Sequence, residues 1–366
     1  MQQATPTRTS RPALVLVGGL VLATLLGACS GSSATTPAAS AASAATTSAP
    51  TEAAASAAPA AAASPAAASG MPARPGGGGP GAVSGPAATY ADVPYATVSA
   101  SQALDIWIPT TGSGPFPLVI FVHGGAFKGG DKAMEAGNVA AVLEAGYAAA
   151  SLNYRLSGEA IFPAAVQDVK AAVRFLRANA AEYGLDPDRF AAWGESAGGN
   201  LVALLGTTGD QATIFDDPAL GNADTSSAVQ AVVDWYGPTD FLQMDAQFAA
   251  ATPAACNGET QAHDPADSPE SVYLGAAIQT VPDLAAAANP ITYIATATKL
   301  PAFSIAHGDS DCLVPNQQSA ILQDALQAAG ATSTFTLVEG ASHGDQAITS
   351  AQTPVALEML ASVFGK

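Results

Sequence analysis

Short apolar runs alternate with segments of helical periodicity along most of the chain. Continuous apolar runs bounded by glycine or proline are typical of strands that are buried on both faces of a sheet. We expect strands over residues 117–125, 146–154, 189–194, 228–237, 301–308 and 333–340. Helical spacing indicates helices over residues 133–145, 162–184, 199–205, 316–329 and 352–364. This alternation predicts the α/β class: a mostly parallel, doubly wound sheet with helices on both faces.

Two segments break the alternation. Residues 30–88 consist almost entirely of Ala, Ser, Thr, Pro and Gly, which cannot bury a core, so we interpret them as a disordered tether. Residues 239–288 are polar and rich in Pro and Ala, and we expect an inserted cap or loop region there. The folded domain is therefore expected over residues 89–366, with this insert inside it.

The first 29 residues have the features of a signal peptide. Arg8 and Arg11 precede an apolar run over residues 13–28, which is short for a membrane span and suits export. The run ends in "LGAC", which resembles a bacterial lipobox whose cysteine, Cys29, is lipidated. We therefore expect an exported chain, anchored to the bacterial cell envelope by lipid. An ordinary signal peptide, which would give a secreted protein, is the alternative.

Cysteine usage predicts one cross-link. The chain has three cysteines, and lipidation of Cys29 leaves Cys256 and Cys312 as a pair in an exported protein. We predict a disulfide between Cys256 and Cys312; two free, buried thiols are the alternative.

Composition argues against several kinds of partner. The chain carries 12 basic and 30 acidic residues, a net charge of −18, whereas phosphate binding needs clustered Lys and Arg. We therefore expect no nucleic-acid partner, and membrane contact only through the lipid anchor. No set of His, Cys, Asp and Glu has metal-ligand spacing, and no glycine-rich loop carries the lysine of a phosphate site, so no metal and no cofactor are expected.

Polar side chains and glycines follow four of the predicted strands, at the edge where open parallel sheets form their sites. The most distinctive stretch is "GESAG", which places Ser196 between a predicted strand and a predicted helix. A serine on such a turn is presented as a nucleophile, and the helix N-terminus adds N–H groups and a positive dipole end. A small residue where strand and helix pack closely is the alternative.

A serine nucleophile needs a histidine base, which a carboxylate orients. The chain has four histidines. His123 and His307 lie in glycine turns, where we expect them to shape the loop, and His263 lies in the insert, where we expect it to be exposed. His343 follows the last strand on a glycine-flanked loop, and it is the candidate base.

The same strand ends supply an acid and N–H donors. Asp309 and Asp311 both follow a predicted strand and are candidates for the carboxylate. The N–H groups of Ala197, Gly124 and Gly125 are candidates for an oxyanion hole, because glycine lets the backbone approach a substrate carbonyl closely. A glycine turn without this role is the alternative for the last two.

These stretches together resemble the α/β-hydrolase family, in its esterase/lipase branch with an HGG oxyanion motif. The matching segments are "VIFVHGGAFKGGDK", "FAAWGESAGGN", "VVDWYGPTDF", "SPESVYLG" and "HGDSDCLVP". The branch includes feruloyl-esterase-like and hormone-sensitive-lipase-like enzymes, and "HGGA" and "WGES" favour the feruloyl-esterase-like side. The family places its acid just before a V-P pair, which indicates Asp311 rather than Asp309.

The resemblance implies a serine carboxylic-ester hydrolase that acts on a small-molecule ester through an acyl-enzyme. Ser196, His343 and Asp311 occur in the chain order of α/β-hydrolases when taken as nucleophile, base and acid. Two alternatives are a serine peptidase of the same fold and a non-catalytic envelope binding lipoprotein on a hydrolase scaffold. The complete Ser, His and Asp set argues against the second.

Other residues near these motifs have expected structural roles. Arg155 and Asp168 are interpreted as an ion pair behind the site, and Glu195 as a hydrogen-bonding group beside the nucleophile. Trp193 and Phe127 are candidates for an apolar acyl pocket, with a place in the core as the alternative for each.

Overall fold

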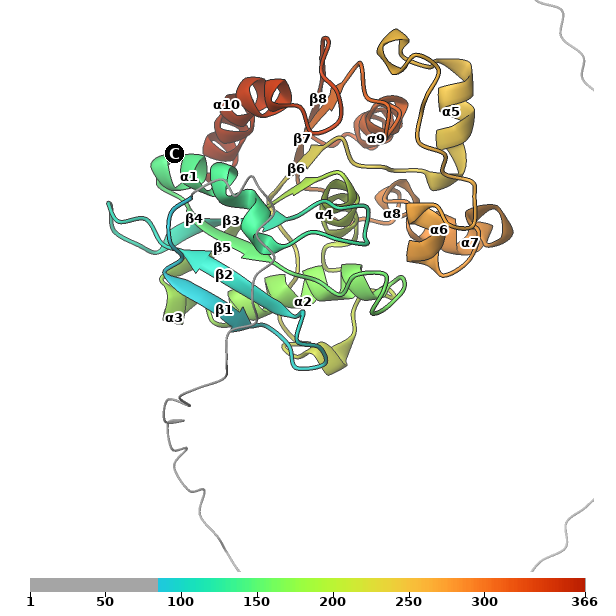
Figure 1. The fold of residues 1–366 in the computed structure, drawn as a ribbon. Helices are drawn as coiled ribbons and strands as arrows, with labels where there is room; N and C mark the ends of the chain where they lie inside the picture. The colour runs from blue at the N-terminus through green and yellow to red at the C-terminus, as the bar shows by residue number, and fades with distance from the viewer. Residues whose placement is uncertain (1–84, 366) are drawn as a thin grey trace, which may run out of the picture. The chain divides into compact units, whose positions relative to one another are not determined.

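A twisted, mostly parallel sheet runs through the centre of the computed structural model, which describes residues 85–365 (Figure 1). Its eight strands within these residues lie in the order β1-β2-β4-β3-β5-β6-β7-β8. The strands are β1 (Tyr90–Pro94), β2 (Ala103–Trp107), β3 (Phe116–Val122), β4 (Ala148–Leu152), β5 (Leu185–Glu195), β6 (Ala231–Trp235), β7 (Ala302–Gly308) and β8 (Ser333–Val338). Neighbouring strands from β4 to β8 are parallel, which confirms the predicted fold class.

The two strands at one edge, β1 and β2, were not predicted from the sequence. Both pair antiparallel, β1 with β2 and β2 with β4. Each is short, β1 is mostly exposed and ends in Pro94, and Asp105 interrupts the apolar residues of β2. Neither strand therefore has the continuous apolar run that marked the buried strands.

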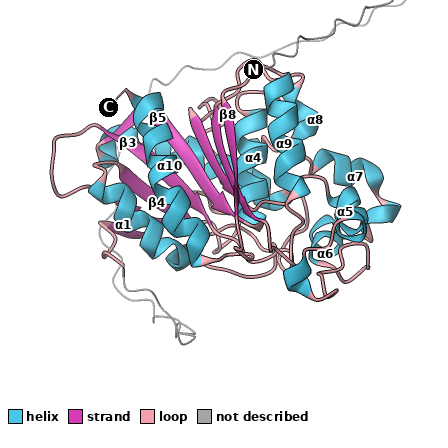
Figure 2. Cartoon of the chain, turned by 90° about the horizontal axis from the view of Figure 1, so that it is seen from above, coloured by secondary structure: helices cyan, strands magenta, loops and turns pink. Residues whose placement is uncertain are grey.

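Helices cover both faces of the sheet, as the view along it shows (Figure 2). On one face α1 (Ala136–Glu144) and α10 (Gln346–Phe364) enclose a core that contains the rings of Trp193 and Trp235. On the other face the larger core lies under three helices: α2 (Ala164–Ala178), α4 (Ala197–Thr208) and α9 (Gln317–Ala328). The doubly wound arrangement leaves the carboxyl ends of β3, β5, β7 and β8 at one edge of the sheet.

Most helix boundaries differ slightly from the predicted ones. The helix expected over 133–145 divides into the 3₁₀ turn η1 (Lys132–Glu135) and α1. The one expected over 162–184 divides into α2 and the single-turn α3 (Ala180–Tyr183). Helix α10 begins at Gln346 rather than at residue 352, because the Asp345 side chain accepts a hydrogen bond from the N–H of Ala347 and caps the first turn.

The predicted insert, residues 239–288, is built of short helices. They are η3 (Phe241–Gln243), α5 (Met244–Ala250), η4 (Ala254–Cys256), α6 (Pro269–Leu274), η5 (Ile278–Thr280) and α7 (Pro282–Ala287), and α8 (Ile291–Ile294) leads from them to β7. Helices α5, α6 and α7 group together at one side of the molecule (Figures 1 and 2). Phe241, Met244 and Tyr273 are buried in the core under α4, so the insert shares the core of the domain.

The N-terminal boundary of the folded domain lies earlier than predicted. Residues 85–88 were assigned to the tether, but Pro86 accepts a hydrogen bond from the indole N–H of Trp107 at 2.8 Å, and Ala88 packs against the core. The predicted signal peptide with Cys29 and residues 30–84 of the tether lie outside the described residues.

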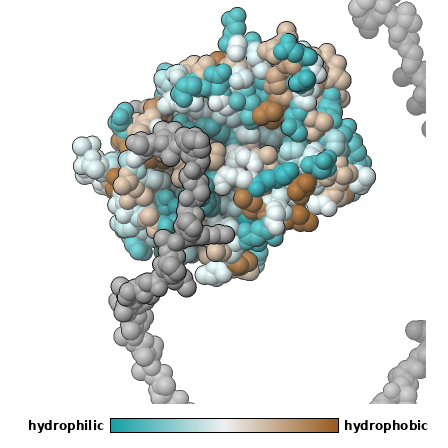
Figure 3. Space-filling view, viewed as in Figure 1, coloured by the Kyte–Doolittle hydropathy of each residue, from teal (hydrophilic) through white to brown (hydrophobic). Residues whose placement is uncertain are grey.

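Figure 3 shows the hydropathy of the residues on one face of the described part of the chain, where grey atoms do not cover it. Apolar residues on that face lie in small, separate groups among hydrophilic ones. Within residues 85–365 no helix is long and apolar enough to cross a membrane.

Candidate active site

Ser196 lies on the sharp turn between β5 and α4, half-buried at the edge of the sheet. Its φ is +54°, which a non-glycine residue rarely adopts, and its N–H donates to the carbonyl of Trp235 at 2.9 Å. A Cβ on Gly198 would lie 2.0 Å from the Val122 carbonyl oxygen, and one on Gly194 would lie 2.2 Å from that of Gly198. The flanking glycines therefore allow the close packing that holds Ser196 in this conformation.

A hydrogen-bonded chain connects Ser196 to a histidine and a carboxylate. The Oγ atom of Ser196 lies 2.9 Å from Nε2 of His343, and Nδ1 of His343 lies 2.6 Å from Oδ2 of Asp311. The three residues come from three strand ends: after β5, after β8 and after β7. The structure thus brings together the three residues that the sequence analysis put forward as nucleophile, base and acid.

Asp311 is buried and fully hydrogen-bonded. Its Oδ1 accepts the N–H groups of Leu313 and Val314 at 2.8 and 2.9 Å, and its Oδ2 faces both His343 and His307. Burial alone would raise the pKa of this carboxyl, but the hydrogen bonds and charges of the two histidines hold it well below its usual range. Asp311 is therefore ionised over the whole range in which a histidine titrates.

The competing carboxylate, Asp309, organises the neighbouring loops instead. It accepts the N–H of Gly340 at 2.7 Å and the hydroxyl of Ser310 at 3.0 Å. The structure places Asp311, and not Asp309, against His343.

His307 contacts the acid, a contact that the sequence analysis missed. Its Nε2 lies 3.1 Å from Oδ2 of Asp311 and 3.0 Å from the carbonyl of Val314, while its Nδ1 lies 2.8 Å from the hydroxyl of Ser319. The sequence does place His307 at the end of a buried strand, four residues before Asp311. His307 therefore fixes the acid as well as shaping its own loop.

Three backbone N–H groups in the turns after β3 and β5 lack an acceptor within the described residues. Within the described part of the chain, the N–H groups of Gly124, Gly125 and Ala197 have no protein acceptor. Gly125 has φ +112°, and a Cβ there would lie 2.2 Å from the Gly129 carbonyl oxygen, so the loop requires glycine. This geometry suits the predicted oxyanion hole.

Aromatic rings hold the loop that follows β3. The His123 ring stacks on Tyr154 at 4.4 Å between centroids, and the Tyr154 hydroxyl donates to the His123 carbonyl. Burial lowers the pKa of His123, which favours the neutral form of the ring. Phe127, with φ +58°, stacks face to face on Tyr273 of α6 at 4.0 Å between centroids. The loop with the N–H donors thus rests partly on the insert.

A polar cluster lies behind the base. The Tyr236 ring packs edge-on against His343, 4.8 Å between centroids, and its hydroxyl donates to Oε2 of Glu195 at 2.6 Å. Asn138 donates to Oε1 of Glu195 at 2.9 Å and to the buried Glu135 at 3.1 Å. Burial raises the pKa of Glu135 well above its usual range, and the Glu195 charge raises it further, so Glu135 is protonated at neutral pH.

A small cavity opens beside Ser196, His343 and Ala197, with a volume of about 80 Å³. Its walls include Phe127 and residues of the insert and the acid loop: Gln261, His263, Pro269, Glu270, Leu313 and Val314. Phe127 thus takes the predicted pocket position. Trp193 lies instead in the core on the α1 and α10 side, packed against Trp235.

The expectation that His263 is exposed was wrong. Its exposed fraction is 1%, because the Phe248 ring of α5 stacks on it and Glu270 of α6 and the Leu313 carbonyl cover its two ring nitrogens.

The expected ion pair of Arg155 with Asp168 is present, at 2.8 Å, with Asp168 fully buried.

Cys256 and Cys312 are bonded to each other in the structure, with 5.6 Å between their Cα atoms. The bond joins η4 of the insert to the residue after Asp311. The insert is thereby fastened directly to the loop that carries the acid.

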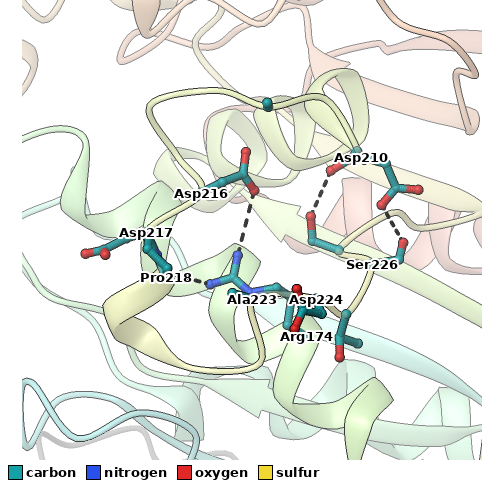
Figure 4. Close-up of a pocket in the computed structure, with 12 residues that line it drawn as sticks. Arg174, Asp210, Asp216, Asp217, Pro218, Ala223, Asp224 and Ser226 are labelled. Carbon is teal, nitrogen blue, oxygen red and sulfur yellow. Dashed lines mark hydrogen bonds and ion pairs between the residues drawn. The ribbon is translucent and has the colours of Figure 1, made fainter.

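A larger hollow, about 390 Å³, lies at the other end of α4 (Figure 4). It is lined by residues around η2 (Pro218–Leu220), and Arg174 reaches from α2 toward Asp216 and the backbone of Asp217 there. The fully buried Lys170 also pairs with Asp216, at 2.7 Å. These contacts hold the loop before β6, and the hollow contains neither Ser196 nor His343.

The sheet order and the positions of Ser196, Asp311 and His343 after β5, β7 and β8 define an α/β-hydrolase fold. The family model described as BD-FAE matches residues 104–326, and the chain belongs to the BD-FAE family.

Proteins and solved structures that this chain is similar to are named as esterases or ester hydrolases. Esterase LipQ of Mycobacterium tuberculosis is 30% identical over 283 residues, covering 76% of this chain and 62% of LipQ. The probable carboxylic ester hydrolase LipM of the same organism is 32% identical over 273 residues, covering 70% of this chain and 58% of LipM. The chain thus spans about three fifths of the length of these relatives. A truncated carbohydrate esterase from gut microbiota superposes with a TM-score of 0.68 at 33% identity, covering 77% of this chain and 100% of that one.

Proposed function

We propose that this protein is a serine carboxylic-ester hydrolase that forms an acyl-enzyme on Ser196. The observation that carries the proposal is the continuous hydrogen-bonded chain from Ser196 Oγ through both nitrogens of His343 to Asp311. The names of its relatives support the reaction class, since LipQ and the carbohydrate esterase are both described as esterases.

In the proposed first step, Ser196 Oγ attacks the ester carbonyl carbon while Nε2 of His343 takes the hydroxyl proton. Asp311 holds the Nδ1–H of His343 and stabilises the imidazolium that forms. The N–H groups of Gly124, Gly125 and Ala197 donate to the oxyanion. Each such donor contributes about 3 kcal/mol to transition-state stabilisation.

Collapse of the tetrahedral intermediate breaks the bond to the alcohol oxygen, which leaves with the proton from His343. A water molecule then attacks the acyl-enzyme, again giving a proton to His343. The carboxylic acid product leaves, and Ser196 recovers its proton. His343 therefore accepts and returns one proton in each half of the reaction, so both halves balance.

The size of the cavity favours short acyl groups. Its volume, about 80 Å³, is far below the roughly 300–1,000 Å³ of sites that enclose drug-sized ligands. We therefore propose a substrate with a small acyl chain, whose alcohol part extends into solvent.

Export is a second part of the proposal. The lipobox-like "LGAC" and the cysteine pair support a chain that is anchored to the cell envelope through Cys29.

The test is turnover of p-nitrophenyl acetate by the full-length chain. Ser196→Ala is expected to lower kcat by about a thousandfold or more, because no other group can form the acyl-enzyme. Ser350→Ala, at an exposed position on α10, is the matched control and should keep wild-type turnover. Turnover retained by Ser196→Ala would refute the assignment.

Two companion measurements separate the alternatives. A fluorophosphonate probe should label the wild type on Ser196, whereas a non-catalytic binding scaffold gives no label. A panel of esters of increasing acyl length, with feruloyl and acetyl-sugar esters and an aminoacyl amide, should show preference for the short esters. Preference for the amide would favour a peptidase.

A further inference from the structure

The buried His263 places an acceptor opposite each of its ring nitrogens. Nδ1 lies 2.9 Å from Oε2 of Glu270 in α6, and Nε2 lies 3.0 Å from the carbonyl oxygen of Leu313. A neutral imidazole has one N–H and donates to only one acceptor, whereas the imidazolium donates to both. With Glu270 ionised, the positively charged ring is the form that satisfies this geometry.

The surroundings of His263 are acidic and closely packed. Asp245 of α5 accepts the backbone N–H groups of His263 and Asp264, at 2.7 and 2.9 Å, and Phe248 of the same helix stacks on the ring. Burial alone lowers the pKa of His263, but the hydrogen bond and charge of Glu270, the charge of Asp245 and the Leu313 carbonyl raise it above the ordinary value of 6.5. His343 faces the same cavity.

The carbonyl that His263 binds belongs to the turn that holds the acid. The N–H groups of Leu313 and Val314 both donate to Oδ1 of Asp311. Cys312, which lies between Asp311 and Leu313, is bonded to Cys256 of the insert, and its carbonyl accepts the N–H of Gln261 at 2.9 Å. Three links therefore fasten the insert to the Asp311 turn: the disulfide, the Gln261 hydrogen bond and the His263 hydrogen bond. Only the last of these depends on the protonation of a side chain.

We propose that His263, as an imidazolium paired with Glu270, is a positioning residue that clamps the insert onto the Asp311 turn, so that hydrolysis requires His263 protonated while His343 is neutral. The proposal rests on the proposed function of Ser196, His343 and Asp311. It makes the insert part of the catalytic machinery as well as a wall of the cavity.

The sign of the pH effect follows from the raised pKa of His263 in the folded protein. Below the ordinary histidine pKa, His263 is protonated and the clamp is complete. The clamp is lost as pH rises through the pKa of His263 in the folded protein. The base His343 must lose its proton to act, so activity rises with pH on the acid side. The profile of kcat against pH is therefore expected to be bell-shaped, with the alkaline limb set by His263.

Glu270→Gln tests the clamp, because it removes the charge that holds the imidazolium and keeps the side-chain shape. The alkaline limb of kcat is expected to move to lower pH by about one pH unit, as the loss of a neighbouring opposite charge produces. Below pH 6 the kcat of the variant should approach that of the wild type. Glu259→Gln removes the same charge from an exposed position of the same insert and should leave the limb in place.

Two outcomes overturn the proposal. One is a Glu270→Gln variant that is folded by circular dichroism and loses kcat equally at every pH, which would show a merely structural role. The other comes from ¹⁵N NMR of the four histidine side chains in the full-length chain, assigned by single substitutions: a His263 ring that is already neutral at pH 6. The NMR result needs no turnover, so it separates failure of the clamp from failure of the proposed hydrolase activity.

Discussion

At the scale of single residues, the "GESAG" turn satisfies both interpretations that the sequence allowed. Gly198 is needed because a Cβ there would collide with the Val122 carbonyl, so strand and helix do pack closely. The same close packing holds Ser196 at a positive φ with its hydroxyl toward His343. Close packing is therefore the means by which the serine is presented, and the two interpretations are not alternatives.

The pair of glutamates behind the site is a second residue-scale feature. Glu195 has its two oxygens occupied by Tyr236 and Asn138, whereas Glu135 is almost fully buried with one donor, Asn138. Glu135 therefore keeps its proton at neutral pH, because burial and the neighbouring Glu195 both raise its pKa.

Glu135→Gln is expected to make the free energy of unfolding less dependent on pH between pH 5 and 8. The folded protein keeps Glu135 protonated, whereas the unfolded chain loses this proton near pH 4.5. Below pH 4.5 Glu135 is protonated in both states and does not lower the free energy of unfolding. As pH rises from there toward the pKa of Glu135 in the folded protein, the free energy of unfolding falls by about 1.4 kcal/mol for each pH unit. Gln does not ionise, so urea unfolding of the variant should lose less stability between pH 5 and 8.

The control for this measurement is Glu144→Gln, at an exposed position on α1, which should follow the wild-type curve. Curves for Glu135→Gln and the wild type that stay parallel over the whole pH range would contradict a protonated Glu135.

At the scale of elements, the insert is the part whose structure the sequence concealed. Its helices are one or two turns long and start from local signals, such as Ser268, which caps α6 by accepting the N–H of Ser271. Periodicity needs longer windows than these helices provide. Their arrangement is fixed by burial of Met244 and Tyr273 in the common core and by the link from Cys256 to Cys312.

Reduction of the Cys256–Cys312 bond is expected to destabilise the protein. The bond closes a loop of 56 residues, for which chain entropy gives a stabilisation of about 4 kcal/mol at most. The unfolding temperature should therefore fall on treatment with reductant, and the Cys256→Ser/Cys312→Ser double variant should show the same fall without it. Alkylation under denaturing, non-reducing conditions should leave both residues unmodified; their modification would mean two free thiols.

At the scale of the whole molecule, the sequence was sufficient for the parallel sheet and for the residues at its carboxyl edge. Ser196 and His343 were predictable because each follows a predicted strand, and parallel strands bring such positions together. Asp311 was separated from Asp309 by the family's V-P motif. The roles of His263 and Tyr236 depend on contacts with Leu313 and Glu195, which are distant from them in the chain. Such contacts leave no periodic or motif signal, so only the structure revealed them.

The proposed anchoring also belongs to the whole molecule. Expressed in a bacterial host, the mature protein is expected to begin at Cys29 and to carry the mass of a lipid modification, as mass spectrometry of its N-terminal peptide would show. Cys29→Ser should release the protein from the membrane fraction. An N-terminal peptide with an unmodified Cys29 would contradict the lipobox and support an ordinary signal peptide.

The stacking of Phe127 on Tyr273 has a consequence for engineering the protein. Phe127 follows the glycine loop that is proposed to bind the oxyanion, and Tyr273 belongs to the insert that walls the cavity. A chimera that receives the insert of a relative, in order to change its substrate range, would also lose the support of that loop. Substrate range and rate constant are therefore expected to change together in such chimeras, and libraries that vary the insert should vary Phe127 and position 273 as a pair.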